Sequence, residues 1–139
     1  MALTHDRNTV RRTGEILVLP VAANAKIYAG ALVTLNANGY AVPGSTAVGL
    51  RAAGRAEQAV DNTGGADGAV SIKVRRGVFK YKNAAADAMG RQHVLGNCYI
   101  VDDETVAATD GAGTRSPAGI VLAVDSDGVW VQIGGAFSF

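Results

Sequence analysis

The sequence has few of the residues that cross-link, coordinate or catalyse. Its 139 residues include one cysteine and two histidines, which excludes an intrachain disulfide. His5 and His93 have no ligand-type residue three or four positions further on, as a helical metal site would need. No serine lies in a Gly-x-Ser-x-Gly motif. We therefore expect no catalytic residues, no metal site and no cofactor, and we expect that the protein is not an enzyme.

Surplus charge and long apolar runs are also scarce. The formal net charge is +1, which provides no overall field for a polyanion, so nucleic acid is not an expected partner. No apolar run approaches the length that spans a membrane, and the first residues lack the apolar core of a signal peptide. We expect a protein made in the cytoplasm that has no membrane partner.

Glycine and small apolar residues are abundant instead. The chain has 18 glycines and is 48% hydrophobic but only 6% aromatic, a composition that suits short strands joined by glycine-rich turns. The length fits one domain. We expect an all-β fold with one short helix, forming a compact small barrel or sandwich over residues 15–139. Residues 1–14 are polar and indicate an extended N-terminal arm.

The clearest hairpin covers residues 119–133. Two β-branched runs flank Asp-Ser-Asp-Gly at 125–128, which favours a turn, because a calcium loop would need further acidic ligands. Trp130 adds a large ring, and we expect this hairpin to form core. Cys98 lies in another expected strand, where a buried, inert thiol is the usual role.

Three further segments carry local predictions. Residues 83–89 are expected to form the one helix, with Asn83 as its cap and Gly90 as its end. Residues 61–68 have no side chains suited to a core and predict a surface loop. Residues 70–82 alternate apolar and polar side chains up to Arg75, and a bend is expected at Arg76 and Gly77.

A weak internal repeat relates the two halves of the chain. Residues 30–42 and 96–108 each read as glycine, strand, Asn or Asp turn and returning strand. A glycine-led apolar run and a valine-rich strand follow in both halves. Chance similarity among short valine-rich strands competes with this interpretation. If the repeat is real, the fold contains two related β-units.

Basic residues supply the candidate contact site. The arm carries three arginines in a segment too polar to fold alone, and it is either a disordered terminus or an arm that orders against acidic groups of a partner. The strand at residues 70–82 carries five cations, some of which must meet carboxylates of this domain or of a neighbour. Nucleic acid could also satisfy them, but the low net charge and the lack of a wider aromatic platform speak against it. The candidate residues for contact with a partner protein or a neighbouring subunit are Arg7, Arg11, Arg12, Lys73, Arg75 and Arg76.

The order and spacing of several short motifs resemble the small capsid cement, or decoration, proteins of tailed bacteriophages. The resemblance covers about residues 16–133. The motifs include Ile-Tyr-Ala-Gly-Ala-Leu-Val at 27–33, Asn-Gly-Tyr-Ala-Val-Pro at 38–43, Cys-Tyr-Ile-Val-Asp-Asp-Glu-Thr-Val at 98–106 and Val-Trp-Val-Gln-Ile at 129–133.

The resemblance implies a non-catalytic β-rich protein on the outside of an icosahedral shell. Its partners would be the major capsid protein and further copies of itself, commonly in a homotrimer. It would be part of the virion after assembly in the cytoplasm of a host bacterium. The main alternative is a β-rich module of a phage tail or surface structure that recognises a glycan or a protein; one tryptophan and four tyrosines, mostly inside expected strands, speak against it. A part of an enzyme complex is a third alternative without support in the sequence.

Overall fold

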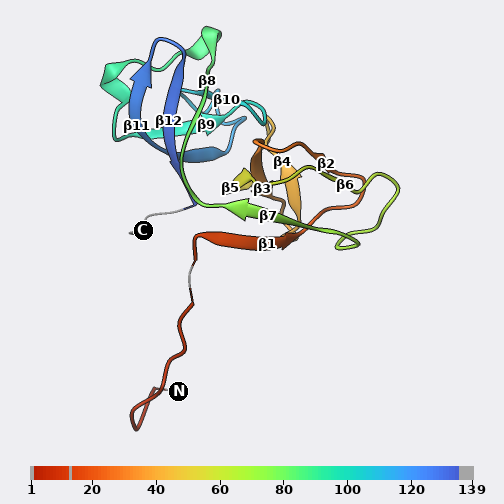
Figure 1. Ribbon diagram of the computed structural model, residues 1–139. Helices are drawn as coiled ribbons and strands as arrows, with labels where there is room; N and C mark the ends of the chain where they lie inside the picture. Colours follow the sequence, from red (N-terminus) through yellow and green to blue (C-terminus); the bar gives the residue numbers. More distant parts are fainter. Residues whose placement is uncertain (1, 13, 135–139) are drawn as a thin grey trace.

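The computed structural model describes residues 2–12 and 14–134, and its regular structure is almost entirely β (Figure 1). Glycine, proline and Asn or Asp turns separate the strands, in keeping with the composition. The elements in chain order are β1 (Ile16–Pro20), β2 (Lys26–Ile27), β3 (Leu32–Leu35), β4 (Ala41–Pro43), β5 (Arg51–Ala56), β6 (Val60–Asp61), β7 (Ser71–Arg75), β8 (Gly77–Asn83), the 3₁₀ turns η1 (Ala85–Asp87) and η2 (Arg91–His93), β9 (Asn97–Ile100), β10 (Thr105–Ala107), β11 (Pro117–Asp125) and β12 (Gly128–Ile133).

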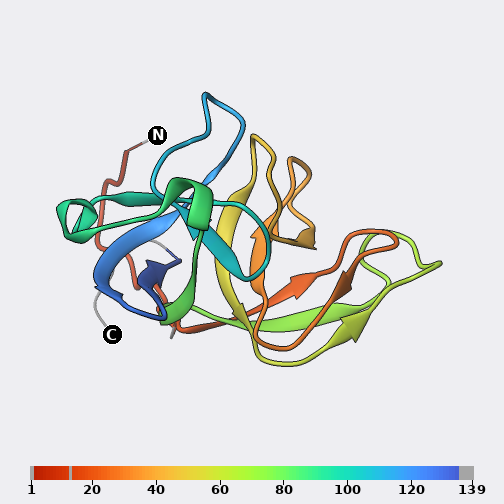
Figure 2. The same ribbon diagram turned by 90° about the horizontal axis from the view of Figure 1, so that it is seen from above.

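The strands form two units that lie side by side, as the view from above shows (Figure 2). The first unit is a five-stranded sheet in the order β1-β7-β5-β3-β4, with the small β2-β6 ladder beside it. The second unit is a closed barrel in the order β10-β8-β12-β11-β9. Its one parallel pairing, β8 with β10, closes the barrel. The expected all-β fold is confirmed, and the expected small barrel accounts for the second unit.

The two units share one strand order. If β8, β9, β10, β11 and β12 are matched with β1, β3, β4, β5 and β7, every antiparallel pairing of one unit recurs in the other. The parallel closure recurs as a single bridge between Val21 and Ala41 in the first unit. The two related β-units expected from the repeat are therefore seen in the topology. The strand pairing places Val33, opposite Gly54, at the position that Cys98, opposite Gly119, holds in the second unit. This structural alignment differs by one residue from the sequence match of residues 30–42 with 96–108.

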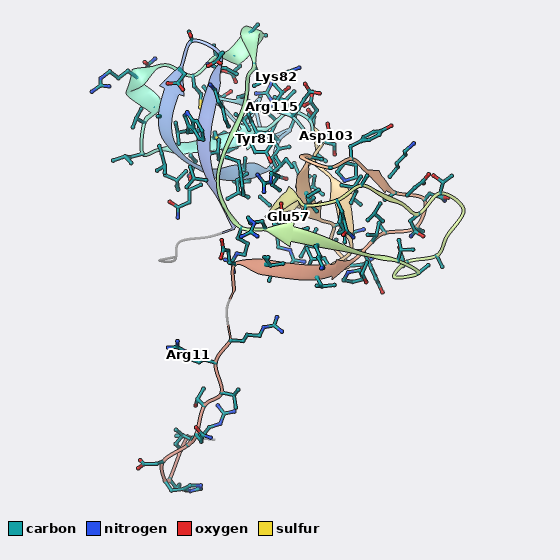
Figure 3. The ribbon with its side chains drawn as sticks, in the orientation of Figure 1. Arg11, Glu57, Tyr81, Lys82, Asp103 and Arg115 are labelled. Atoms are coloured by element: carbon teal, nitrogen blue, oxygen red, sulfur yellow. The ribbon has the colours of Figure 1, made fainter. Side chains whose placement is uncertain are left out.

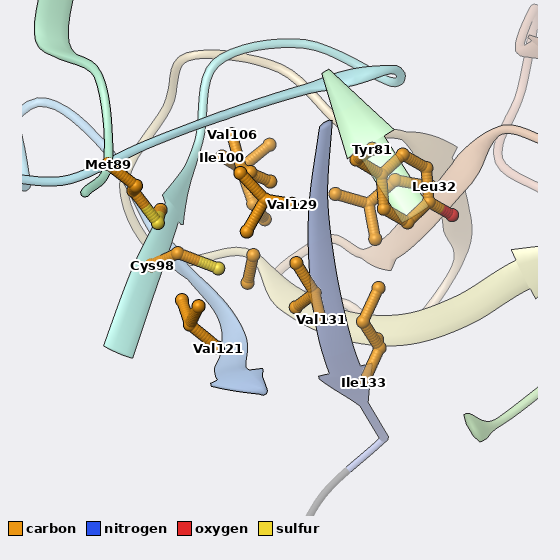
Figure 4. Packing of buried hydrophobic residues seen from close by; sticks show 11 residues of the cluster. Leu32, Tyr81, Met89, Cys98, Ile100, Val106, Val121, Val129, Val131 and Ile133 are labelled. Carbon is orange, nitrogen blue, oxygen red and sulfur yellow. The ribbon is translucent and has the colours of Figure 1, made fainter. Parts of the chain in front are cut away.

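Each unit has its own core. Alternation in β7 buries Ile72 and Val74 and leaves Lys73 exposed, as predicted. Cys98 is fully buried in the second core, which also confirms the prediction. Figure 4 shows the second core, which includes Leu32 from β3 of the first unit. Leu32 thus ties the two units together.

Trp130 corrects one expectation. It lies in β12 between the buried Val129 and Val131 and is 37% exposed, on the outer face of the barrel. Its indole nitrogen donates to Oδ2 of Asp125 at 2.8 Å. The strand alternation controls this position, because inward valines on both sides require an outward residue between them. The hairpin itself is confirmed, with Asp125 paired to Gly128 across the turn.

The helix expected at residues 83–89 is wrong. Only the three residues of η1 are helical there, and the turn is of the 3₁₀ type. Asn83 does not cap it; the Asn83 amide accepts from the Met89 nitrogen at 2.8 Å and donates to the Met89 oxygen at 3.0 Å. These bonds close a loop across the segment in place of helical hydrogen bonds. The predicted bend at Gly77 is present, and there the chain passes from the first unit to the second.

The loop at residues 61–68 projects from the first unit in both views (Figures 1 and 2). It is mostly exposed, as predicted, but Asn62 is buried. The Asn62 amide donates to the oxygens of Ala22 at 2.9 Å and Ala66 at 3.0 Å. One asparagine therefore anchors the loop on the chain that follows β1.

The N-terminal arm leaves the body at the start of β1 (Figure 1). Residues 2–12 are exposed throughout. The expected boundary at residue 15 agrees with β1 beginning at Ile16. Residues 1 and 13 of the expected arm, and residues 135–139 of the expected domain, lie outside the described residues.

Candidate interaction surfaces

The arm presents its arginines without a partner carboxylate among the residues that the structure describes. Arg7 donates only to the neighbouring Thr9 hydroxyl at 3.3 Å. Arg11 and Arg12 are exposed, and among the described residues no ion pair includes any of the three. Figure 3 shows Arg11 well away from the body. The structure thus keeps these three predicted contact residues together on one exposed segment.

Arg75 is held inside the first unit. Its guanidinium contacts Oε1 of Glu57 at 2.5 Å and Oε1 of Glu15 at 2.6 Å. Arg55 contacts the other oxygen of Glu57 at 2.6 Å. Hydrogen bonds from Arg75 and Arg55 hold the pKa of Glu57 below its usual range. Arg75 therefore meets carboxylates of its own domain, one of the two alternatives that the sequence left open.

Of the other cations between residues 70 and 82, some contact groups of this domain and one does not. Lys80 contacts Asp127 at 2.5 Å, and Lys82 pairs with Glu104. Arg76 is also engaged within the protein, where it donates to the Gly14 oxygen at 3.4 Å. Lys73 is exposed and forms no ion pair with any described residue. Of the predicted contact residues on this strand, Lys73 is the one the fold leaves most available.

Equivalent outer faces of the two units differ in chemistry. In the first unit Ile16, Arg75 and Arg55 lie in one row across β1, β7 and β5. The matching row of the barrel is Val78, Gln132 and Ile120. In this row the first unit thus carries two ion-paired arginines beside Ile16, whereas the barrel carries two apolar side chains and a glutamine. We call this second surface the outer apolar face; it comprises Val78, Ile120, Leu122 and Trp130.

Three adjoining hollows share Gly30 and lie along the junction of the two units. Two of them, of about 330 and 460 Å³, open between the Gly30 turn, the end of β8 and the β9–β10 turn. The third, of about 310 Å³, extends toward Trp130, where Arg55 lies 4.5 Å from the centre of the Phe79 ring. We call the first two the seam hollow, lined among others by Tyr28, Gly30, Tyr81, Lys82, Asp103 and Glu104.

Two polar groups of the seam hollow lack an expected partner among the described residues: the Tyr81 hydroxyl has no hydrogen bond, and the Asp103 carboxylate has no cation. Tyr81 is 6% exposed, and its hydroxyl makes no hydrogen bond to any described residue. Burial raises the pKa of Tyr81. Asp103 is half-buried, and no ion pair with a described residue includes it. Its pKa is raised by burial and then by the nearby carboxylates of Asp102 and Glu104.

Asp103 gives a prediction with a defined pH dependence. Because its pKa is raised in the fold, ionisation opposes folding, and the penalty grows as pH rises through the carboxylate range. At a protein concentration low enough to keep the chains dissociated, we expect Asp103→Asn to raise the urea midpoint slightly at pH 7 and to leave it unchanged at pH 3. The control Asp110→Asn, on an exposed loop, should change neither midpoint. A lower midpoint for Asp103→Asn at pH 7 would show that the carboxylate stabilises the fold.

Sequence reasoning missed both groups. The run Asp102, Asp103 and Glu104 was visible as a turn, and its excess of negative charge was the available signal. Tyr81 could have been placed inward by alternation along β8, since Lys80 and Lys82 on either side are exposed. Their approach to Gly30, however, depends on how the two units pack, which no local pattern specifies.

Other chemistry is limited in the described part of the chain. No cluster of three or more His, Cys, Asp or Glu is arranged to hold a metal ion among residues 2–12 and 14–134. Burial raises the pKa of the Cys98 thiol to about 12, so the thiolate that reacts is scarce at neutral pH. Within the same residues, no helix has the length and apolar character to cross a membrane.

Comparisons with known proteins add no further assignment. A scan of family models, a search of curated proteins and a search of solved structures each gave no significant match.

Proposed function

We propose that this protein is a structural virion protein that binds the outside of a bacteriophage capsid and cements neighbouring major capsid subunits. It does so as a homo-oligomer, with a trimer as the favoured form. The observation that carries the proposal is the arm, an exposed segment that extends from a compact β body and displays Arg7, Arg11 and Arg12. The motif resemblance to capsid cement proteins supports the same function.

The physical basis is that of a segment that orders on binding. An exposed, polar arm gains no burial from its own body, so it gains order only from contacts with a partner. Arginine suits such contacts because its planar group forms paired hydrogen bonds with carboxylates. Lys73 on the body adds a further cation for a protein partner. With a net charge of only +1, nucleic acid is not part of this proposal.

Binding to shells that lack the protein tests the proposal. We expect the protein to sediment with such shells and to saturate at a fixed ratio to the major capsid protein. Changing Arg7, Arg11 and Arg12 to Gln should leave the fold intact by circular dichroism and weaken binding by about tenfold or more. The control changes Arg51 and Arg91, exposed cations elsewhere, to Gln and should bind normally. Full occupancy by the arm variant would refute the role of the arm, and no sedimentation of the wild-type protein would refute the function.

One observation favours the alternative of a glycan-binding module. Tyr28 follows the end of β2 and is 59% exposed, and Trp130 lies inside a strand, β12, as expected, yet is 37% exposed. Exposed aromatic rings beside charged groups provide stacking surfaces for sugars. Saturable quenching of Trp130 fluorescence by soluble surface polysaccharide of the host, without binding to shells, would favour this alternative.

A further inference from the structure

The seam hollow has more negative charge than its own cations neutralise. Its lining carboxylates are Asp103, Glu104 and Asp127. Lys82 pairs with Glu104 and Lys80 pairs with Asp127, which leaves Asp103 over. Asp103 keeps a half-buried carboxylate without a cation. A buried or half-buried carboxylate of this kind is stabilised by a cation that brings its own hydrogen-bond donors.

The buried hydroxyl of Tyr81 is a second and independent sign that the hollow is incomplete. Tyr81 lines it from β8, with its ring packed beside Leu32 (Figure 4). A buried hydroxyl normally has a hydrogen-bond partner, and this one has none among the described residues. Tyr81 and Asp103 line adjoining parts of the seam hollow that share Gly30 and Glu104. N–H donors suit both groups, and the guanidinium group has five of them.

The arm carries that chemistry. Arg7, Arg11 and Arg12 are the exposed guanidinium groups on an extended segment, and they have no carboxylate partner in the described part of the chain. The arm runs away from the body that bears it (Figure 3), and no arginine is among the described residues that line the seam hollow. Eight residue steps separate Arg7 from Glu15, and eight extended residues span about 26 Å. This exceeds the radius of gyration of a body of this size, about 14 Å, so the arm can cross to a neighbour.

We propose that the arm of one copy binds the seam hollow of a second copy, with an arm arginine paired to Asp103 of that copy. Each copy then both gives an arm and receives one. Such a contact joins different surfaces of the two partners, and repetition around an axis closes a ring. The inference rests on the proposed homo-oligomer and deepens it by naming the surfaces that meet.

Association of the purified full-length protein tests this arrangement without shells. We expect concentration-dependent association of the wild type in sedimentation velocity experiments, weakened about tenfold or more by Asp103→Asn. A variant with Arg7, Arg11 and Arg12 changed to Glu, and separately Asp103→Arg, should each be monomeric alone. The control Asp110→Asn should associate like the wild type. Circular dichroism and urea unfolding check that each variant folds. If Asp103→Arg does not fold, the association of Asp103→Asn still tests the proposal.

Mixing the two charge-reversed variants is the decisive test. The Glu-bearing arm of one variant then meets the reversed hollow of the Asp103→Arg variant, while the unchanged arm and the unchanged hollow also meet, so association should return on mixing. If an arm binds its own hollow instead, mixing restores nothing, and the proposal fails. Wild-type protein that stays monomeric, or Asp103→Asn that associates normally, overturns it as well. Normal sedimentation of Asp103→Asn with shells would then leave the capsid function standing, so the two failures are distinguishable.

Discussion

Replacement of Gly119 by alanine is expected to lower the free energy of unfolding by about 3 kcal/mol, at the upper end for overpacking of a fold. Gly119 lies in β11, where its ladder with β9 shifts register. A Cβ at this position would overlap the backbone oxygen of Gln132 in β12 and would approach Cγ1 of Val131 to 3.0 Å. Neither neighbour is the free end of a flexible side chain, so a strand of the barrel must move.

Gly54 extends this prediction to the first unit. It occupies the matching place opposite Val33, and its added Cβ would overlap the backbone oxygen of Arg75 in β7. Gly113→Ala is the control, since φ is +83° there and nothing lies within 4 Å; only the backbone cost of about 1 kcal/mol should remain. Urea unfolding measures all three variants. Equal losses at Gly119 and Gly113 would contradict the close strand approach.

Truncation of Leu32 to alanine should cost about 3 kcal/mol, as for other buried leucines. Leu32 is fully buried, and it belongs to β3 of the first unit while it packs in the core of the second. Its backbone nitrogen also donates to the Asp103 oxygen at 2.8 Å. Because one side chain serves both units, we expect a single unfolding transition that shifts as a whole.

Leu122 provides the matched control for this truncation. It is the same residue type on the outer apolar face and is 38% exposed, so Leu122→Ala should cost less than about 1 kcal/mol. Tryptophan fluorescence and far-ultraviolet circular dichroism should report one midpoint for each protein. Two separate wild-type transitions, or similar losses at Leu32 and Leu122, would show that the units are not coupled through Leu32.

Local patterns predicted much of this fold. Alternation placed Ile72 and Val74 in the core, and the Asp and Gly residues of the 125–128 turn placed the last hairpin. The repeated order of glycines, strands and turns anticipated two units of one topology. These features depend on neighbours in sequence, which is why they could be predicted from it.

The misses depend mostly on contacts that residue type and strand alternation do not specify. Asn83 bonds both backbone groups of Met89 and so prevents the helix that its sequence suggested. The pairs of Arg75 with Glu15 and Glu57 join β7 to the residue before β1 and to the residue after β5, and no local pattern in the sequence specifies these pairs. The seam hollow exists only because two units pack against each other. Trp130 differs, since strict alternation along β12 already indicated its outward direction.

The most direct measurement of the proposed function is cryo-electron microscopy of shells that lack the protein, imaged before and after incubation with an excess of it. We predict additional density on the outer surface at symmetry-related positions, sized for the two-unit body and joined by narrower density that fits the arm. Shells that remain identical at saturating protein would contradict the proposal that it is a capsid decoration protein.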